Sequence, residues 1–318
     1  MSSQFISHCT ADALSSAARG LKDGALIAFP TETVYGLGAD ATNHEAVARI
    51  YKVKGRPQDH PLIVHVASME KIEPWVSDIP DYAISLARDF WPGPLTLILK
   101  RSELAEDFIT GGQETIGVRV PDHTIALALL GAAHLNGIPG IAAPSANRFG
   151  QVSPTTADAV REELGAYLEH RDLILDGGPS SVGVESTIVD CTGTAPRILR
   201  PGAITQEMIE DATGIVVTES GDVIRVSGSL EQHYSPKAKV HLSNTANTGD
   251  GFIAMKNIPT PSGAIRLAEP NSVEEFARVL YSSLRKADSL KLSNVSVVSP
   301  DGKGLALAIR DRLERAAR

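Results

Sequence analysis

Residues 25–38, ALIAFPTETVYGLG, carry the pattern on which the fold of this chain depends. The apolar run 26–29 predicts a buried strand, and Pro30 ends it because proline has no N–H to give to the sheet. The glycines that follow allow the chain to turn and to approach a ligand closely. Two threonine hydroxyls and one tyrosine hydroxyl therefore lie at the end of a strand, where α/β folds usually bind ligands. A plain turn with β-branched residues is the alternative interpretation.

A basic segment, Lys54-Gly55-Arg56-Pro57, follows a helix predicted over 43–53. Gly55 and Pro57 prevent this helix from continuing, so both cationic residues are expected on an irregular segment. Two cations so close together repel each other unless an anion neutralises them, and an ammonium beside a guanidinium suits phosphate oxygens. The segment indicates an anion site, with a solvated basic turn as the alternative.

A third strand end lies after the apolar run 140–143, which stops at Pro144. Ser145 and Asn147 follow with the two-residue spacing that places side chains on one side of an extended segment. The small Ala143 beside them permits a ligand to approach. The pattern indicates a hydroxyl and an amide that face a ligand together, and a Ser/Asn turn is the alternative.

Further strands end in cationic residues. Alternation along 115–120 places Arg119 on the same face as Thr115. Arg200 ends an apolar strand before a Pro-Gly pair. His65 ends another apolar strand, and the alternative for it is a core histidine whose hydrogen bonds are satisfied. If these strand ends gather, they form a pocket rich in cationic and hydroxyl groups, without an obvious nucleophile. Such a pocket suits nucleotidyl or acyl-phosphate chemistry, in which positioning and charge neutralisation do most of the work.

Composition restricts the class of protein. The 318 residues are 42% hydrophobic, 21% charged and 5% aromatic, which is typical of a globular chain of about two domains. Two cysteines make neither a disulfide framework nor a Cys-rich zinc module, and they favour a reducing, cytoplasmic location. No His, Cys or acidic cluster has metal-ligand spacing. The apolar run 125–133 is too short to cross a membrane, and the start MSSQFISHCT does not resemble a secretory signal.

Charge is unevenly distributed along the chain. Residues 1–237 contain 18 Lys and Arg against 30 Asp and Glu, and the remainder contains 12 against 8. An anion site in the first part must therefore be a local basic pocket within an acidic body. The basic C-terminal part could touch nucleic acid, although a solvated basic helix face is the more ordinary interpretation.

The chain divides into three parts. In 1–217, helices are predicted over 11–22, 43–53, 80–91, 122–135 and 156–164, and strands over 26–29, 62–66, 95–99, 115–120, 138–143, 173–175, 186–190 and 196–199. Consecutive strands after residue 165 favour a large twisted mixed sheet, hence an α/β fold with some antiparallel pairing. Residues 218–238 are polar and are predicted as a linker. In 239–318, strands over 239–242, 251–255, 263–267 and 295–299 alternate with helices, which predicts a small parallel α/β domain.

Two helix starts carry capping signals. Asp122 is predicted to cap the helix over 122–135, and Ser272 with Glu275 has the spacing of a capping box.

The motifs occur in the order PTETVYGLG, KGRP followed by PLIVHV, FWPGPLTLIL, VRVP, APSAN, GVESTIVD and ILRPG. In this order they resemble the YrdC family, densely over about residues 30–202. The linker sequence HYSPKA and the C-terminal GLALAIRDRLERAA resemble the long, two-domain form of that family.

The resemblance implies both a fold and a reaction. The fold would be a twisted open mixed sheet with helices around a positively lined cavity, plus a small Rossmann-like C-terminal domain. The reaction would be that of a nucleotidyltransferase that condenses L-threonine, bicarbonate and ATP, with Mg2+, into threonylcarbamoyl-AMP and pyrophosphate. A separate threonylcarbamoyl transferase would use this product to form N6-threonylcarbamoyladenosine on tRNA, with weak direct tRNA contact and no membrane partner.

Carried over position by position, the resemblance implies catalytic roles for Lys54 and Arg56. It implies a threonine pocket made of Thr33, His65, Arg119, Ala143 and Ser186, with Arg119 as partner of the carboxylate. It implies ATP-binding roles for Arg56, His60, Thr115, Ser145, Asn147, Ser153, Arg200 and Tyr234, the last closing over the cavity from the linker. It implies no metal ligand among the side chains.

The sequence departs from the family pattern in the linker, where Ser227-Gly228-Ser229 stands in place of Pro-Gly-Met, and in its short C-terminal domain. The altered linker puts closure over the site in question and leaves a catalytically silent ATP sensor as one alternative function. The other alternative is a module that binds double-stranded RNA or tRNA through a basic cavity, against which the acidic balance of residues 1–237 speaks.

Overall fold

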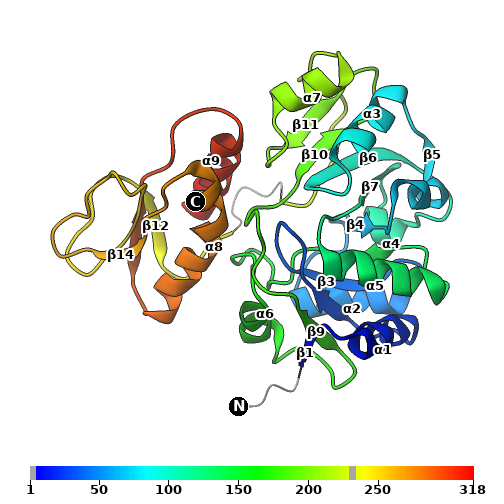
Figure 1. The fold of residues 1–318 in the computed structure, drawn as a ribbon, viewed down its shortest axis with the longest axis horizontal. Helices are drawn as coiled ribbons and strands as arrows, with labels where there is room; N and C mark the ends of the chain where they lie inside the picture. Colours follow the sequence, from blue (N-terminus) through cyan, green and yellow to red (C-terminus); the bar gives the residue numbers. More distant parts are fainter. Residues whose placement is uncertain (1–4, 229–233) are drawn as a thin grey trace.

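The computed structural model describes residues 5–228 and 234–318, which form a larger body followed by a smaller C-terminal domain (Figure 1). The linker residue Ser229 lies outside the described residues. The strands of the larger body are β1 (Ile6–His8), β2 (Ile27–Phe29), β3 (Gly36–Asp40), β4 (Ile63–His65), β5 (Val76–Asp78), β6 (Leu95–Arg101), β7 (Thr115–Arg119), β8 (Ile141–Ala142), β9 (Leu173–Asp176), β10 (Thr187–Asp190) and β11 (Arg197–Arg200). Its helices are α1 (Ala11–Lys22), α2 (His44–Lys54), α3 (Asp81–Phe90), α4 (Asp107–Thr110), α5 (Thr124–Leu135), α6 (Ala157–Leu164) and α7 (Gln206–Thr213), with a 3-10 helix at Met69–Trp75.

The strands of the larger body form one mixed sheet in the order β1-β9-β2-β3-β8-β4-β7-β6-β10-β11, with β5 paired to β6. Pairing is parallel between β4 and β7 and between β6 and β10, and antiparallel between β6 and β7 and between β10 and β11. This confirms the predicted α/β fold with a mixed sheet. Each predicted strand run of the larger body contains a strand, and each predicted helix is present. The ends of these strands determine where the polar side chains meet.

One element of the larger body contradicts the sequence reading. Gly36 and Gly38, expected to let the chain turn and approach a ligand, lie in β3, a strand between β2 and β8. At Gly38 a Cβ would lie 2.7 Å from Ile141 Cγ2 and 2.8 Å from Phe29 Cε1, so the glycine is needed for close packing inside the sheet. Glycine in a strand therefore marked a close approach of neighbouring side chains rather than a turn.

Two helix caps also differ from prediction. His123, not Asp122, caps α5, because its ring Nδ1 accepts the Ile125 N–H at 3.2 Å. At the start of α8 (Val273–Ser289), the Ser272 hydroxyl accepts the Glu275 N–H at 3.1 Å as expected. The Glu275 carboxylate accepts from Asn271 N at 2.7 Å, so the reciprocal half of the capping box is displaced by one residue.

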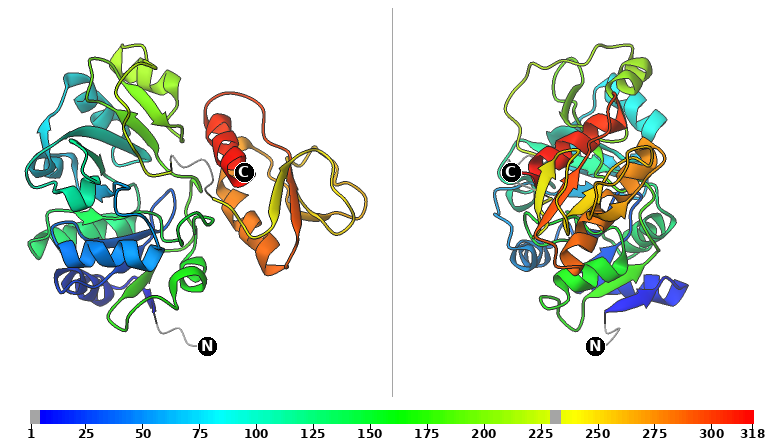
Figure 2. Two further views of the ribbon diagram at one scale, coloured as in Figure 1. Left: turned by 180° about the vertical axis from the view of Figure 1, so that it is seen from behind. Right: turned by 90° about the vertical axis from the view of Figure 1, so that its left-hand side faces the viewer.

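The C-terminal domain is the small parallel α/β unit that the sequence predicts. Its strands β12 (Lys239–Leu242), β13 (Gly251–Ile253), β14 (Ile265–Ala268) and β15 (Asn294–Val297) pair in parallel in the order β12-β15-β13-β14. Helices α8 and α9 (Leu305–Ala316) lie on the side that faces the larger body, and β12 and β14 lie farther away (Figures 1 and 2).

The two parts share a hydrophobic core. Val34, Val152 and Val184 of the larger body pack in one buried cluster with Phe276 and Tyr281 of α8. The two parts are thus in direct contact beside the loop that follows β2. No helix in the described part of the chain is long and apolar enough to span a membrane.

Candidate active site

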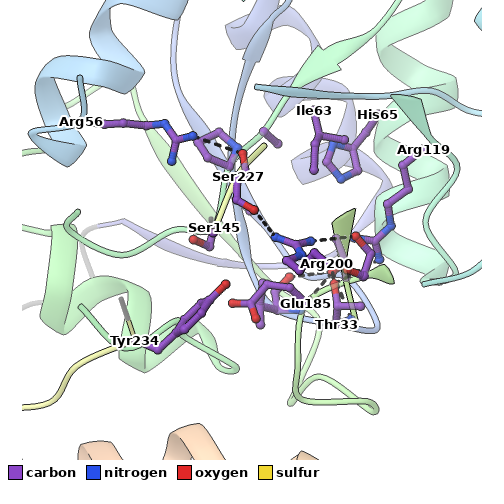
Figure 3. Close-up of a pocket in the computed structure, with 17 residues that line it drawn as sticks. Thr33, Arg56, Ile63, His65, Arg119, Ser145, Glu185, Arg200, Ser227 and Tyr234 are labelled. Carbon is purple, nitrogen blue, oxygen red and sulfur yellow. Dashed lines mark hydrogen bonds between the residues drawn. The ribbon is translucent and has the colours of Figure 1, made fainter. Parts of the chain in front are cut away.

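Strand ends and loops of the larger body enclose a small cavity of about 50 Å3 (Figure 3). Its walls come from the loop after β2, the ends of β4, β7 and β11, the loop after β8, the turn before β10, and the linker. Three arginines, Arg56, Arg119 and Arg200, line it together with threonine and serine side chains. Segments that are distant in the sequence therefore converge on one cationic, hydroxyl-rich site, as the strand-end pattern predicts.

Arg119 lies at the end of β7 and is nearly neutralised. Its Nη2 is 2.6 Å from Glu32 Oε1, and both side chains are about 5% exposed or less. The same Nη2 donates to Thr33 Oγ1 at 3.1 Å. The Glu32 contact is an ion pair without an aligned N–H···O bond, since both carboxylate oxygens lack a hydrogen-bond partner among the described residues. Arg119 and Glu32 therefore form no bidentate pair.

His65 is paired across the sheet with Arg119, at the neighbouring strand end. Burial and then the charge of Arg119 lower the pKa of His65 to about 3. The imidazole is therefore neutral at physiological pH, and it offers the cavity one donor and one acceptor rather than a charge.

Arg56 and Arg200 have a different environment from Arg119. Within residues 5–228 and 234–318, neither forms an ion pair with a carboxylate. Arg56 Nη2 donates to Pro61 O at 3.0 Å and to Ser227 Oγ at 3.2 Å. Arg200 Nη1 donates to Ser227 O at 2.8 Å, and its Nε and Nη2 donate to Ser186 O and Oγ. Two buried cations that are paired only with neutral oxygens form a site for an anion.

Burial reduces the preference of both guanidiniums for their charged form. Burial lowers the pKa of Arg56 to about 10, and the neighbouring Arg200 adds to the lowering. Burial also lowers the pKa of Arg200, and Arg312 contributes repulsion. Both groups remain cationic at neutral pH, so the repulsion between them is relieved when an anion binds.

Ser227 of the linker lies between these two arginines. Ser227 is hydrogen-bonded to both of them (Figure 3). A second, smaller cavity of about 10 Å3 shares Ile63 and Ser227 with the first and is lined by Thr115. Ser227 therefore lines both cavities. Ligand pockets measure about 300–1,000 Å3, so neither cavity by itself has the volume of a nucleotide site in this arrangement.

Contacts with Gln113 and Tyr281 also hold described residues of the linker in place. Gln113 Oε1 accepts the Arg225 N–H at 2.8 Å and Gln113 Nε2 donates to Arg225 O at 3.0 Å. Tyr234 is 1% exposed and stacks on Tyr281 with ring centroids 5.7 Å apart. Gly228 has φ +84°, and a Cβ there would clash with the Tyr234 hydroxyl, so only glycine fits beneath the tyrosine.

Most of the residues selected from the sequence line the cavity. They are Thr33, Arg56, His65, Arg119, Ala143, Ser145, Ser186, Arg200 and Tyr234, which include the whole predicted threonine pocket. Five others do not line it in this arrangement. Thr115 faces the second cavity, and His60 packs edge-on against Phe149. Asn147 Nδ2 donates to Arg148 O and Gln151 O, and the Ser153 hydroxyl donates to Glu185. Lys54 lies beneath the 143–147 loop.

The position of Lys54 corrects the expectation that its ammonium and the guanidinium of Arg56 lie together on an irregular segment. Lys54 is the last residue of α2 and is 2% exposed. Its Nζ donates to Ser145 O at 2.5 Å and to Asn147 O at 2.6 Å. Burial, followed by the charge of Arg56, lowers the pKa of Lys54 well below its ordinary value. In this arrangement Lys54 supports the loop that carries Ser145, and Arg56 alone of the two reaches the cavity.

The sequence reading missed three residues of the site. Glu32 neutralises Arg119, Glu185 lines the cavity, and Ser227 bridges the two remaining arginines. Both glutamates could have been selected from the sequence, because each is a charged residue of a motif and directly precedes a predicted site residue. Ser227 could have been selected because it stands where the family pattern has proline.

The cavity combines two arginines from strand ends, Arg119 and Arg200, with Arg56 from the loop after α2 and with several hydroxyls, which defines an α/β protein that binds polar, anionic ligands. Comparison with known proteins narrows the class. Residues 19–202 match the Sua5/YciO/YrdC family model, described as telomere recombination, and residues 204–318 match the model described as threonylcarbamoyl-AMP synthase, C-terminal domain. The chain belongs to the Sua5/YciO/YrdC family, in the form with a second domain, and the resemblance inferred from its motifs is confirmed.

Similar proteins cover the chain almost completely. The threonylcarbamoyl-AMP synthase of Pyrococcus abyssi is 41% identical over 95% of this chain and 93% of its own. That of Bacillus subtilis is 38% identical over 96% of this chain and 92% of its own. The crystal structure of P. abyssi Sua5 complexed with L-threonine superposes with a TM-score of 0.88 at 38% identity, covering 98% of this chain and 97% of that one.

Proposed function

We propose that this chain is a threonylcarbamoyl-AMP synthase. It condenses L-threonine, bicarbonate and ATP to threonylcarbamoyl-AMP and pyrophosphate, which makes it a nucleotidyltransferase. The observation that carries the proposal is the convergence of Arg56, Arg119 and Arg200 on one cavity that also contains the whole predicted threonine pocket. The curated relatives of nearly equal length support it, and so does the P. abyssi Sua5 complex with L-threonine.

The threonine end of the site is the part around Arg119. The guanidinium of Arg119, which lines the cavity, receives the threonine carboxylate. Thr33 and Ser186 supply hydroxyls, and Ala143 leaves room for the substrate. The neutral His65 accepts a hydrogen bond from the amino acid without adding a charge.

The nucleotide end contains Arg56 and Arg200. After the linker moves, these cations receive the phosphate oxygens, and the ATP-binding roles assigned to His60, Thr115, Ser145, Asn147, Ser153 and Tyr234 belong to this open arrangement. Lys54, assigned a catalytic role, would act at the site through the loop that it holds. Charge stabilisation of this kind contributes several kcal/mol to a phosphoryl transition state, typically about 3 kcal/mol per donor.

The reaction has two bond-forming steps. The threonine ammonium loses a proton to solvent, and the free amine attacks the carbon of bicarbonate, which gives a carbamate and releases water. An oxygen of the carbamate then attacks the α-phosphorus of ATP, and the bond from this phosphorus to the bridging oxygen breaks as pyrophosphate leaves. No protein side chain forms a covalent intermediate, so the chain contributes orientation and charge neutralisation.

Mg2+ enters this proposal with the nucleotide. Among the described residues, no group of three or more His, Cys, Asp or Glu could hold a metal ion. Of the two carboxylates at the site, Glu185 uses both oxygens in hydrogen bonds, and Glu32 is paired with Arg119. These residues do not fit a protein-held Mg2+, and phosphate oxygens are the usual ligands that bring this ion to an enzyme.

The wider setting is also proposed. The product would serve a separate threonylcarbamoyl transferase that modifies tRNA in the cytoplasm. We retain the division into a catalytic domain (1–217), a linker (218–238) and a C-terminal domain (239–318). Expression of the isolated segment 1–217 with a measurement of its folding tests that division, and cell fractionation tests the location.

Incubation of the chain with ATP, bicarbonate and L-threonine tests the activity. Mass spectrometry should detect threonylcarbamoyl-AMP, and pyrophosphate release should require all three substrates. Binding of ATP without any threonine-dependent pyrophosphate would instead identify the ATP sensor. RNA binding with a steep salt dependence and no nucleotide affinity would identify the RNA-binding module.

A further inference from the structure

Glu185, at the wall of the cavity, is held by the C-terminal domain. Its Oε1 accepts the Ser153 hydroxyl at 2.6 Å. Its Oε2 accepts the Tyr281 hydroxyl of α8 at 2.7 Å and Arg312 Nε of α9 at 3.0 Å. Three donors from three separate segments thus converge on one buried carboxylate, and two of them come from outside the catalytic body. We call these four residues the interdomain cluster.

Arg312 is fully buried, with 0% of its side chain exposed. Its Nη2 donates to Pro201 O at 3.0 Å, directly after Arg200, and its guanidinium lies 5.4 Å from the ring centroid of Tyr234. Burying a guanidinium has a large desolvation cost, and apolar contacts alone would join two domains more cheaply. The arginine also contacts the linker tyrosine and the residue that follows a cavity arginine, so its position relates to the site as well as to domain packing.

The charges around Glu185 show what Arg312 does for the site. Burial alone would raise the pKa of Glu185, but Arg312, Arg200 and the hydrogen bonds from Ser153 and Tyr281 lower it to about 2. Glu185 is therefore ionised, and it lies close enough to Arg200 to influence it (Figure 3). Without Arg312, this carboxylate has Arg200 as its remaining cationic neighbour. An ion pair between the two would cancel a charge that the anionic ligand needs.

We propose that Arg312 and Tyr281 of the C-terminal domain are positioning residues for the nucleotide end of the site: they engage Glu185 and so keep Arg200 available to the phosphates. The proposal rests on the proposed function, since it takes the anion at Arg200 to be a nucleotide. It assigns a role in catalysis to the second domain, through Glu185, without any contact between that domain and the substrates.

The test is a rescue experiment on the full chain. Arg312→Gln should weaken binding of the non-reactive α,β-methylene-ATP, measured by calorimetry, by at least about tenfold. Adding Glu185→Gln to the same chain should restore affinity to within about threefold of the wild type, because the competing carboxylate is gone. A structural role alone predicts the opposite, since the second substitution removes further hydrogen bonds from the interface.

Two further variants complete the design. Tyr281→Phe removes one donor and little else, so it should fold and weaken nucleotide binding by about threefold. Arg310→Gln, on the same helix but bonded to Pro300 and Gly302, is the matched control and should bind as the wild type does. A double variant as weak as Arg312→Gln alone, or an unchanged Arg312→Gln, would overturn the proposal.

The experiment also separates this inference from the proposed function. A wild-type chain that binds nucleotide but forms no threonylcarbamoyl-AMP would refute only the proposed reaction, and the rescue would still be measured by binding. A wild-type chain that binds no nucleotide would overturn both.

Discussion

Replacing Ser227 with alanine should raise the affinity of the chain for nucleotide. Ser227 Oγ accepts from Arg56 Nη2 at 3.2 Å and donates to Pro61 O at 3.1 Å. Each bond contributes about 1 kcal/mol net, so the substitution should destabilise the seated linker by about 1–2 kcal/mol. The Ser227 carbonyl keeps its bond to Arg200, which is why the loss is partial.

This free energy translates directly into affinity. A nucleotide binds only when the linker has left the space between Arg56 and Arg200, so the seated linker reduces the apparent affinity by the fraction of open molecules. A change of about 1–2 kcal/mol corresponds to roughly a five- to thirtyfold change in that fraction. Affinity for nucleotide should rise by the same factor as long as the closed form predominates.

Calorimetry with α,β-methylene-ATP on the full chain measures this effect, and Ser220→Ala is the control, since Ser220 is an exposed serine of the same linker. Hydrogen exchange over residues 222–228 should accelerate in Ser227→Ala and not in the control. Equal or weaker nucleotide binding by Ser227→Ala would refute the reasoning, because it would mean that the hydroxyl contributes to the ligand site rather than competing with it.

Other substitutions test the remaining parts of the site. Lys54→Met leaves two buried loop carbonyls without a donor and should destabilise the fold by about 2–4 kcal/mol, measured by urea unfolding; an unchanged midpoint would contradict the supporting role. Glu32→Gln leaves Arg119 buried without its counterion, so it should lower the melting temperature of the free protein and enlarge the stabilisation by added threonine; equal threonine shifts in both proteins would argue against this pairing. The depressed pKa of Glu185, about 2 against an ordinary 4.5, contributes about 3 kcal/mol of stability that is fully present above pH 4.5 and lost as the pH falls toward 2. Unfolding of wild type and Glu185→Gln between pH 7 and pH 3 should show this dependence only in the wild type.

The threonine end of the site could be predicted from the sequence because its residues lie at the ends of strands. Strands were recognisable from apolar runs that end at Pro or Gly, and their ends meet at one side of the sheet. His65 and Arg119 illustrate this, since they are neighbours across β4 and β7. The rule requires only that the strands form one sheet, so it did not depend on knowing the strand order.

The nucleotide end was harder to predict because it depends on contacts between distant segments. Ser227 reaches Arg56 across 171 residues of sequence, and Arg312 reaches Glu185 across 127. No local pattern specifies such a partner. Arg312 nevertheless carried a signal, since it occupies the apolar face of the last helix between Ile309 and Leu313, where an arginine requires a buried anion.

The placement of charge in the cavity matches two different ligands. Arg119 is already balanced by Glu32, so this end is close to neutral and accepts a zwitterion such as an amino acid without gaining net charge. Arg56 and Arg200 have only neutral oxygens as partners, and the carboxylate nearest to Arg200 is engaged by Arg312. This end has an uncompensated positive charge that a polyanion neutralises. If Glu32 and Arg312 set this difference in charge between the two ends, each substitution should affect one ligand. Loss of Glu32 should change threonine binding, loss of Arg312 should change nucleotide binding, and neither should have much effect on the other ligand.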